Sequence, residues 1–266
     1  NSTSATIKYR DGATSAAWAT GGNMGTARRL LAGAGTQTVG LGFGGYIGGS
    51  GAQNLTEEYN GTAWTGGGSL ATARYYMGGF GIQTAAAAAG GNGNSTATEE
   101  YNGSSWTAGG ALGTGRGYMG ACGTQTAGLV FGGLPTQDAT EEYNGTAWTA
   151  GGNLNTGRYY SVGAGTQTAG LAFGGSSPGV LTEEYNGTAW TAGGNLGTGR
   201  YNLAGAGLQT AALAFGGQTP SVTAATESYN GTSWTSTTSM STARGKLSGA
   251  GATNTAALAF GGDGGP

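Results

Sequence analysis

Residues 56–64 read TEEYNGTAW, and the same nine letters return at 140–148 and 182–190. Two close variants, TEEYNGSSW and TESYNGTSW, stand at 98–106 and 226–234. In isolation, adjacent carboxylates, an N-G-T triplet and two aromatic rings are typical of a functional site. As one copy among many, the same letters indicate a structural unit. The spacing of the copies distinguishes these two interpretations.

Three markers recur along the chain with a period of more than forty residues. The six tryptophans are separated by 46, 42, 42, 42 and 44 residues, an Arg follows each of them ten residues later, and every copy contains a glycine pair. The tryptophans are Trp18, Trp64, Trp106, Trp148, Trp190 and Trp234, and the arginines are Arg28, Arg74, Arg116, Arg158, Arg200 and Arg244. A shared period of this length is typical of a repeat array.

Each repeat contains four short segments that favour strands over helices. From Arg158 onward we expect RYYSVGAG as a first strand, GTQT as a tight turn, and TAGLAFGG, VLTEEYNG and TAWTAGG as the next three strands. Asn-Gly between two strands predicts a hairpin with a type I′ turn. Four antiparallel strands, repeated six times, predict an all-β, six-bladed β-propeller that forms a single domain over residues 1–266.

The two ends of the chain predict how the ring closes. The chain starts with the third and fourth strands of a blade, SATIKYRDG and AAWATGG, and finishes with a first and second, RGKLSGAG and TAALAFGG. Two and two strands complete one blade, which removes the exposed sheet edges of an open array.

The order of Arg, glycine pair, Tyr and Trp resembles the kelch repeat of galactose-oxidase-type propellers. In one copy the matching residues are Arg158, Gly174–Gly175, Tyr185 and Trp190. The wording of the repeat is also similar to arrays in predicted proteins of marine bacteriophages and ocean metagenomes, which implies a virion- or tail-associated role. In two copies the pattern departs: Tyr9 and Trp18 are nine residues apart, and the stretch TAAAAAGG lacks a Phe. We expect looser packing in those blades.

Composition excludes several classes of function. The chain has 61 Gly, no His and a net charge of −2, so neither a basic nucleic-acid-binding surface nor imidazole-based catalysis or metal binding is indicated. No apolar run is long enough for membrane insertion. The start, NSTSATIKYR, does not resemble a signal peptide, and we expect a mature or excised fragment. Cys122 is expected to fill a small core position. No cofactor is predicted.

The paired glutamates are the remaining candidates for catalysis. Neighbouring residues on a strand point to opposite faces, so Glu183 and Glu184 cannot flank one bond. The sequence therefore predicts a protein that is not an enzyme. Two roles stay open for the six arginines: structural pairing with these glutamates, or a ring that binds an anionic ligand such as a sulfated or uronic-acid glycan. In N-G-[ST], we expect the Asn to form a turn and not to carry a glycan.

Differences between copies point to a binding face. The copies disagree after the glycine pair and just after the Arg, and these two connections emerge on the same face of a four-stranded blade. The tyrosines on this face are Tyr75, Tyr76, Tyr118, Tyr159, Tyr160 and Tyr201. They either recognise a ligand, since amphipathic rings stack on sugars, or fill space between blade tops.

We therefore expect a binding or structural module that recognises a glycan or host-surface receptor. The candidate ligand-binding residues are Arg28, Arg74, Arg116, Arg158, Arg200, Arg244, Tyr76, Tyr118, Tyr160 and Tyr201. A protein–protein scaffold that docks other virion or surface proteins is the alternative, and a glycan-active enzyme is less favoured. A virion-associated or extracellular location is expected, with no nucleic-acid partner and no membrane insertion.

Overall fold

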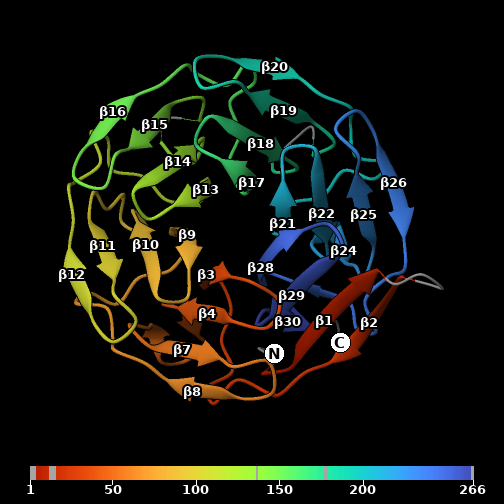
Figure 1. The fold of residues 1–266 in the computed structure, drawn as a ribbon, viewed down its shortest axis with the longest axis horizontal. Helices are drawn as coiled ribbons and strands as arrows, with labels where there is room; N and C mark the ends of the chain where they lie inside the picture. Colours follow the sequence, from red (N-terminus) through yellow and green to blue (C-terminus); the bar gives the residue numbers. More distant parts are fainter. Residues whose placement is uncertain (1–3, 12–15, 136, 177–178, 265–266) are drawn as a thin grey trace.

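The computed structural model describes residues 4–11, 16–135, 137–176 and 179–264. They form six four-stranded antiparallel sheets arranged as blades around a central axis (Figure 1). The chain runs once around the ring, and its red and blue ends meet in one blade. The expected six-bladed β-propeller is confirmed.

We number the blades by the chain order of their innermost strand. Blades 1 and 2 contain β3 (Ala32–Gly35), β4 (Gly40–Phe43), β7 (Thr56–Tyr59) and β8 (Trp64–Gly66), then β9 (Gly78–Ile82), β10 (Ala85–Ala89), β11 (Thr98–Tyr101) and β12 (Trp106–Ala108). Blades 3 and 4 contain β13 (Gly120–Thr124), β14 (Ala127–Phe131), β15 (Thr140–Tyr143) and β16 (Trp148–Ala150), then β17 (Val162–Thr166), β18 (Ala169–Phe173), β19 (Thr182–Tyr185) and β20 (Trp190–Ala192). Blades 5 and 6 contain β21 (Ala204–Leu208), β22 (Ala211–Phe215), β25 (Thr226–Tyr229) and β26 (Trp234–Thr237), then β28 (Ser248–Thr253), β29 (Ala256–Phe260), β1 (Thr6–Asp11) and β2 (Ala16–Thr20).

Blade 6 closes the ring in the predicted way. Its strand order is β2-β1-β29-β28, so two strands come from each end of the chain. The seam is a continuous antiparallel ladder from Thr6↔Phe260 to Arg10↔Ala256. The longer spacing between Tyr9 and Trp18 extends the outer hairpin of this blade without changing its register, since these two residues still pair directly.

The first strand of each blade begins later than the sequence indicates. In blade 4, β17 begins at Val162 and not at Arg158. The reason is Tyr160, whose φ of 59° places it in the left-handed region. A residue in that conformation turns the chain and cannot continue an extended strand.

The Asn-Gly hairpin is confirmed, but its turn is not type I′. In blade 4 the strands flank four residues, 186–189, and only Gly187 has a positive φ, of 89°. The Asn186 side chain accepts hydrogen bonds from the backbone N–H groups of Thr188 and Ala189, both at 2.9 Å. The Asn therefore stabilises the turn through its carboxamide and not through a left-handed backbone, as Asx turns do.

The apolar core lies between neighbouring blades. The Phe that ends a second strand contacts the Trp of the next blade, as in Phe173 and Trp234, whose ring centroids are 4.9 Å apart. Trp64, Trp190 and Trp234 are buried. Trp18, Trp106 and Trp148 are half-buried and pack against the same kind of cluster.

In blade 2, a large side chain on the first strand fills the space left by the small residues of TAAAAAGG on the second strand. In blade 4, Leu171 on the second strand pairs with Ala164 on the first. In blade 2 the sizes are exchanged, because Ala87 pairs with Phe80. Phe80 is 3% exposed and its ring lies 6.1 Å from that of Trp148. The expected loosening of this blade is thereby offset by a second change in the same blade.

Three kinds of polar contact join neighbouring blades. In four copies the second glutamate accepts a hydrogen bond from the next blade's Tyr hydroxyl, as Glu142 does from Tyr185 at 2.6 Å. The Gln of a GTQT-type turn donates to backbone carbonyls of the preceding blade, as Gln167 does to Gly128 and Tyr143. Each Trp donates to a Thr hydroxyl of the preceding blade; the pairs are Trp18–Thr226, Trp64–Thr6, Trp106–Thr56, Trp148–Thr98, Trp190–Thr140 and Trp234–Thr182. These contacts explain why the motif varies so little.

The Tyr–Glu contacts predict a loss of stability at high pH. Burial, followed by the hydrogen bond to the Glu, raises the pKa to about 12 for Tyr101, Tyr143, Tyr185 and Tyr229. The unfolded chain releases these protons near pH 10. Between about pH 10 and 12 the folded state therefore binds more protons, and the free energy of unfolding falls as pH rises.

Denaturant titrations from neutral pH to about pH 12 measure this dependence. Tyr185→Phe removes one of the four Glu-bonded hydroxyls, so the free energy of unfolding of this variant should fall less steeply over the same pH range. Ionisation of every tyrosine near pH 10 in protein that is still folded would contradict the assignment.

Candidate functional site

The repeat arginines are buried in ion pairs. Five of them contact the first glutamate of their own blade; the pairs are Arg28–Glu57, Arg74–Glu99, Arg116–Glu141, Arg158–Glu183 and Arg200–Glu227. The six arginines are at most 2% exposed. Burial lowers the pKa of Arg200, and Glu227 opposes that shift. The guanidinium groups hold strands together and do not reach the surface, so we remove the six arginines from the candidate ligand-binding residues.

Arg244 is the exception among the six. Ile7 occupies the place of the glutamate in blade 6, and the Arg244 side chain donates instead to the backbone carbonyls of Ala5, at 2.8 Å, and Gly261, at 3.4 Å. Burial alone lowers the pKa of Arg244. Backbone carbonyls thus replace a carboxylate at the seam of the ring.

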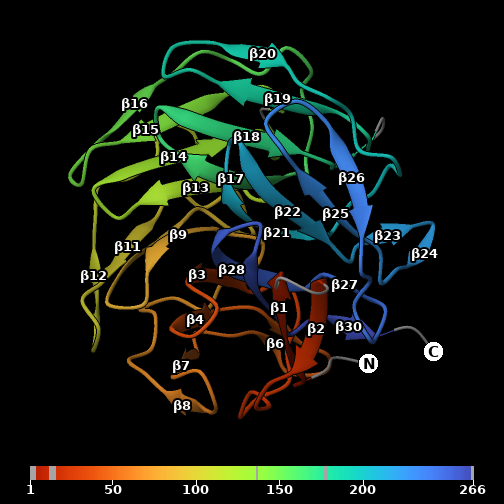
Figure 2. The same ribbon diagram turned by 45° about the vertical axis from the view of Figure 1, so that its right-hand side comes forward.

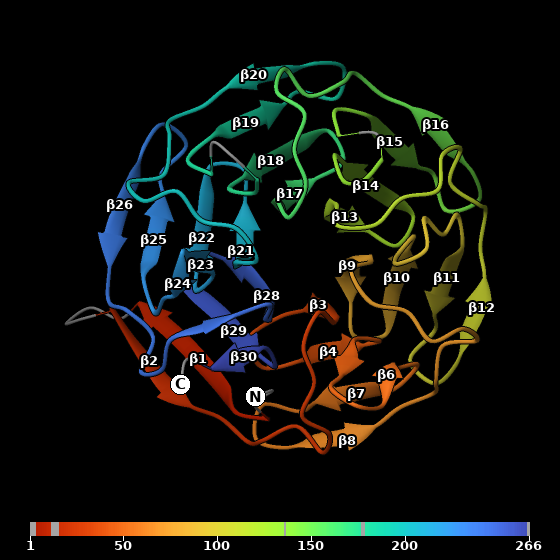
Figure 3. The same ribbon diagram turned by 180° about the vertical axis from the view of Figure 1, so that it is seen from behind.

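The segments in which the copies disagree lie on one side of the ring, which we call the variable face. Short pairings join the residues after an Arg to the loop after a glycine pair: Arg29↔Tyr46, Gly117↔Leu134, Tyr201↔Gln218, and β27 (Arg244–Gly245) with β30 (Asp263–Gly264). The hairpin of β23 (Gln218–Thr219) and β24 (Ser221–Val222) projects from the ring in Figure 2 and lies in front of it in Figure 3. The other small hairpin joins β5 (Tyr46–Ile47) to β6 (Gly51–Ala52). Thr136, in LPTQDA, and residues 177–178, in SSPGVL, lie outside the described residues.

A cavity of about 150 Å³ opens at the central axis on the variable face. One residue from each blade surrounds it, always two positions after the repeat Arg. We call these six residues the mouth ring; they are Leu30, Tyr76, Tyr118, Tyr160, Asn202 and Lys246. Their side chains are half-buried, so a ligand at the axis contacts all six blades.

The mouth ring has a constant backbone and variable side chains. Its six residues have φ between 52° and 63°, in the left-handed region. Backbone hydrogen bonds join five of the six successive pairs, as from Tyr118 N–H to the Tyr76 carbonyl (2.9 Å) and from Tyr160 N–H to the Tyr118 carbonyl (2.8 Å). Bonds from Leu30 to Lys246 and from Lys246 to Asn202 continue the ring across the seam. Non-glycine residues in this conformation are strained and concentrate at functional sites.

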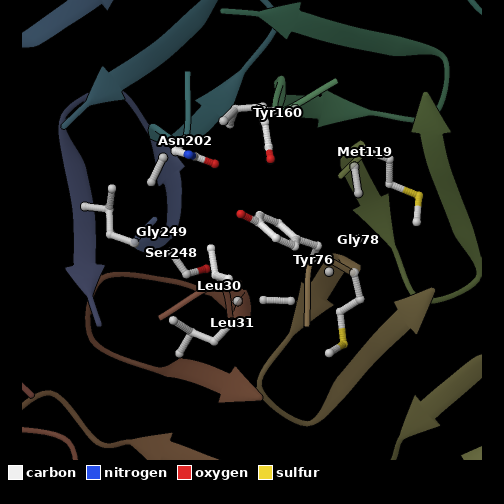
Figure 4. Close-up of a pocket in the computed structure, with 18 of the residues that line it drawn as sticks. Leu30, Leu31, Tyr76, Gly78, Met119, Tyr160, Asn202, Ser248 and Gly249 are labelled. Carbon is white, nitrogen blue, oxygen red and sulfur yellow. The ribbon is translucent and has the colours of Figure 1, made fainter. Parts of the chain in front are cut away.

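Three consecutive members of the mouth ring form an aromatic cluster, the tyrosine arc, defined by Tyr76, Tyr118 and Tyr160. The ring centroid of Tyr76 lies 4.0 Å from that of Tyr118 and 5.4 Å from that of Tyr160. The hydroxyls of Tyr76 and Tyr160 point into the opening (Figure 4). Burial raises the pKa of Tyr76, and the Tyr160 hydroxyl adds to the shift. The arc therefore offers hydroxyl groups and partly exposed ring surfaces.

The opposite half of the mouth ring is aliphatic and polar. It consists of Leu30, Asn202 and Lys246. The Asn202 amide is directed toward the opening in Figure 4. Lys246 is held by Asp263 at 3.2 Å, and Asp263 also binds Arg29 at 2.9 Å. The site is therefore aromatic on one side and carries hydrogen-bonding and charged groups on the other.

Ser161 directly follows Tyr160 of the tyrosine arc and lines the same cavity. It is 5% exposed, and its Oγ has no hydrogen-bond partner among the described residues. The other blades have Leu or Met at this place, as in Met77 and Met119. An unpaired buried hydroxyl costs about 1–3 kcal/mol. A ligand hydroxyl in the cavity would satisfy it.

The structure brings together only part of the predicted site. Tyr76, Tyr118 and Tyr160 meet at the axis, whereas Tyr201 lies at the rim, 6.1 Å from the ring of Tyr160. Ser161 was missed. The sequence did contain an indication of Ser161: of the three copies that read RYY or RGY, two continue with Met and one continues with this Ser.

The far end of the channel offers less chemistry. Its cavity of about 100 Å³ is lined by Gly and Ala, with Phe80 and Cys122 as the larger side chains. Burial raises the pKa of the Cys122 thiol to about 12, so it is neutral at ordinary pH. Across the described residues, no helix has the length and apolar character needed to cross a membrane.

No protein-family model matches the chain, and no curated protein is significantly similar to it.

Proposed function

We propose that this propeller is a non-enzymatic binding module that recognises a sugar at the mouth ring. The observation that carries the proposal is the tyrosine arc beside the unpartnered Ser161 hydroxyl, at one cavity on the face where the copies differ. Aromatic faces stack on the C–H faces of sugars, and a few well-placed polar groups fix orientation.

The size of the cavity limits how much of a ligand it takes. Pockets that enclose a whole ligand usually measure about 300–1,000 Å³, and this one measures about 150 Å³. The site is therefore suited to one terminal sugar residue of a larger glycan, with the rest of the glycan on the surrounding loops. Tyr201 and the Tyr46–Tyr75 pair, whose ring centroids lie 5.3 Å apart, are available beside the opening.

The likeness to kelch repeats and to bacteriophage arrays favours a setting in a virion- or surface-associated protein, with a host-surface glycan or receptor as the partner. Detection of the chain in purified particles, by mass spectrometry, tests this part of the proposal. Recovery only in the cell interior would contradict it.

Loss of the tyrosine arc should abolish sugar binding without unfolding the ring. We propose the double variant Tyr76→Asn/Tyr160→Asn, because Asn202 already occupies an equivalent left-handed position and Asn adopts that conformation readily. A glycan array identifies the bound sugars, and titration calorimetry should then show affinity reduced at least about tenfold, or 1.4 kcal/mol. Unchanged affinity would place binding elsewhere. An array on which the parent binds nothing would favour the protein–protein scaffold.

Ser161→Ala separates binding from folding. The replacement removes a buried group that has no partner, so the melting temperature should stay equal or rise. Sugar affinity should fall by about three- to tenfold, the effect of one hydrogen bond. Ser248→Ala, at the cavity wall in blade 6, is the matched control. An equal loss in both variants would show that Ser161 has no specific role.

A further inference from the structure

We propose that the sugar bound at the mouth ring is an acidic sugar, with one negative charge, and that Lys246 binds its carboxylate or sulfate group. This inference rests on the proposed sugar binding and adds the class of ligand. It is carried by the charges around the cavity and by the position of Lys246 relative to the tyrosine arc.

The mouth of the channel has an excess positive charge. Arg29 and Lys246 share a single carboxylate, that of Asp263. Arg29 Nη1 contacts both oxygens of Asp263, at 3.1 and 2.9 Å, whereas Lys246 contacts one, at 3.2 Å. Among the described residues, these two cations and one anion leave one positive charge. Because Arg29 is the closer partner of Asp263, Lys246 is the cation that can turn to a ligand.

Lys246 is also the cation that reaches the cavity. Among the described residues that line it, Lys246 is charged and none is acidic. Its side chain is 27% exposed, so it is neither buried like the repeat arginines nor fully solvated. A partly desolvated ammonium group attracts an anion more strongly than one in open water.

The arrangement around the ring orients the ligand. Blade 6, with Lys246, lies across the axis from blade 3, with Tyr118 (Figure 1). A sugar that stacks one ring face on the tyrosine arc therefore directs its far edge toward Lys246 and Asn202. One ammonium group matches a ligand with one negative charge. Planar, bidentate recognition of a phosphate would use an arginine, and the six repeat arginines are buried.

The test compares neutral sugars with acidic sugars that differ from them only in the group at C6. The probes are glucose with glucuronate and glucose 6-sulfate, and galactose with galacturonate and galactose 6-sulfate, titrated into the full chain. We expect the acidic member of a pair to bind about tenfold more tightly, with the preference declining as salt is added. The carboxylate and sulfate arms show which acidic group is preferred.

Two variants with opposite effects assign the preference to Lys246. Lys246→Met should abolish the acidic preference, because it lowers the affinity for the acidic sugar far more than the affinity for the neutral sugar. Asp263→Asn, which removes the competing carboxylate, should strengthen the preference. Lys8→Met makes the same change in net charge beside Gly61 and Tyr59, in the hairpin turns on the other face, and should leave the preference intact.

The outcomes separate this inference from the proposed function. If neutral and acidic sugars bind equally, or if the preference survives Lys246→Met in protein that melts like the parent, the acidic-sugar inference is overturned and sugar binding stands. If the parent binds no probe and no glycan on an array, both proposals fail.

Discussion

Glu227→Ala is expected to lower the free energy of unfolding by about 3–5 kcal/mol, because it leaves a buried guanidinium without its counter-charge. Arg200 is fully buried, and its Nη2 contacts Glu227 Oε1 at 2.7 Å. The second oxygen, Oε2, accepts from the Gly197 N–H at 2.7 Å. The substitution therefore removes the partner of a charge and the acceptor of a backbone donor. Denaturant unfolding, with the midpoint and slope compared with those of the parent, measures the loss.

Two further variants show whether the loss comes from the unpaired charge. Replacing both partners, Arg200→Met with Glu227→Leu, should restore most of the stability, since a buried ion pair and an apolar pair of similar size often differ little. Glu184→Ala removes an acid from blade 4 that contacts Tyr229 and, among the described ion pairs, no Arg, and should cost less. A loss below about 1 kcal/mol for Glu227→Ala would mean that carbonyls suffice, as they do around Arg244.

Trp190→Ala is expected to destabilise the fold by about 3–5 kcal/mol. The side chain is 4% exposed. Its ring centroid lies 4.8 Å from that of Phe131 in the preceding blade and 4.9 Å from that of Tyr185 in its own blade. Its Nε1 donates to Thr140 Oγ1 at 2.9 Å. The truncation opens a cavity at a blade interface and leaves the Thr hydroxyl without its donor.

Trp190→Phe divides this effect into its parts. It keeps an aromatic ring and loses the hydrogen bond, so a loss of about 1–2 kcal/mol is expected. Ile82→Ala is the surface control, since Ile82 is 54% exposed, and should change stability by no more than about 0.5 kcal/mol. If Trp190→Ala melts like the parent, the tryptophan is a binding residue of the rim and not part of the core.

The candidate site was predicted only in part, for a reason visible in particular residues. The sequence indicated the face, because RYYM, RYYS and RGKL differ among copies that otherwise agree. It did not distinguish Tyr201, which is one position after an Arg and lies at the rim, from residues two positions after an Arg, such as Asn202, which line the cavity. That distinction depends on the left-handed backbone at the second position after the Arg. The ring of inter-blade hydrogen bonds holds this conformation, and no local pattern in the sequence encodes it.

The sequence by itself determined the number of blades, the four strands in each, and the closure of the ring by both ends. Those features follow from periodicity and from the alternation of short apolar runs with Gly-rich turns, which are local and repeated. It left open whether the arginines bind a ligand or the glutamates, because a one-dimensional pattern carries no burial. Only the tertiary structure placed those arginines inside the blades. It also showed that Phe80, on the first strand of blade 2, fills the space that a leucine on the second strand fills in other blades. Finally, it gathered three tyrosines, Ser161 and Lys246 around one cavity. Such contacts join residues from different blades, and they exist only once the ring has closed.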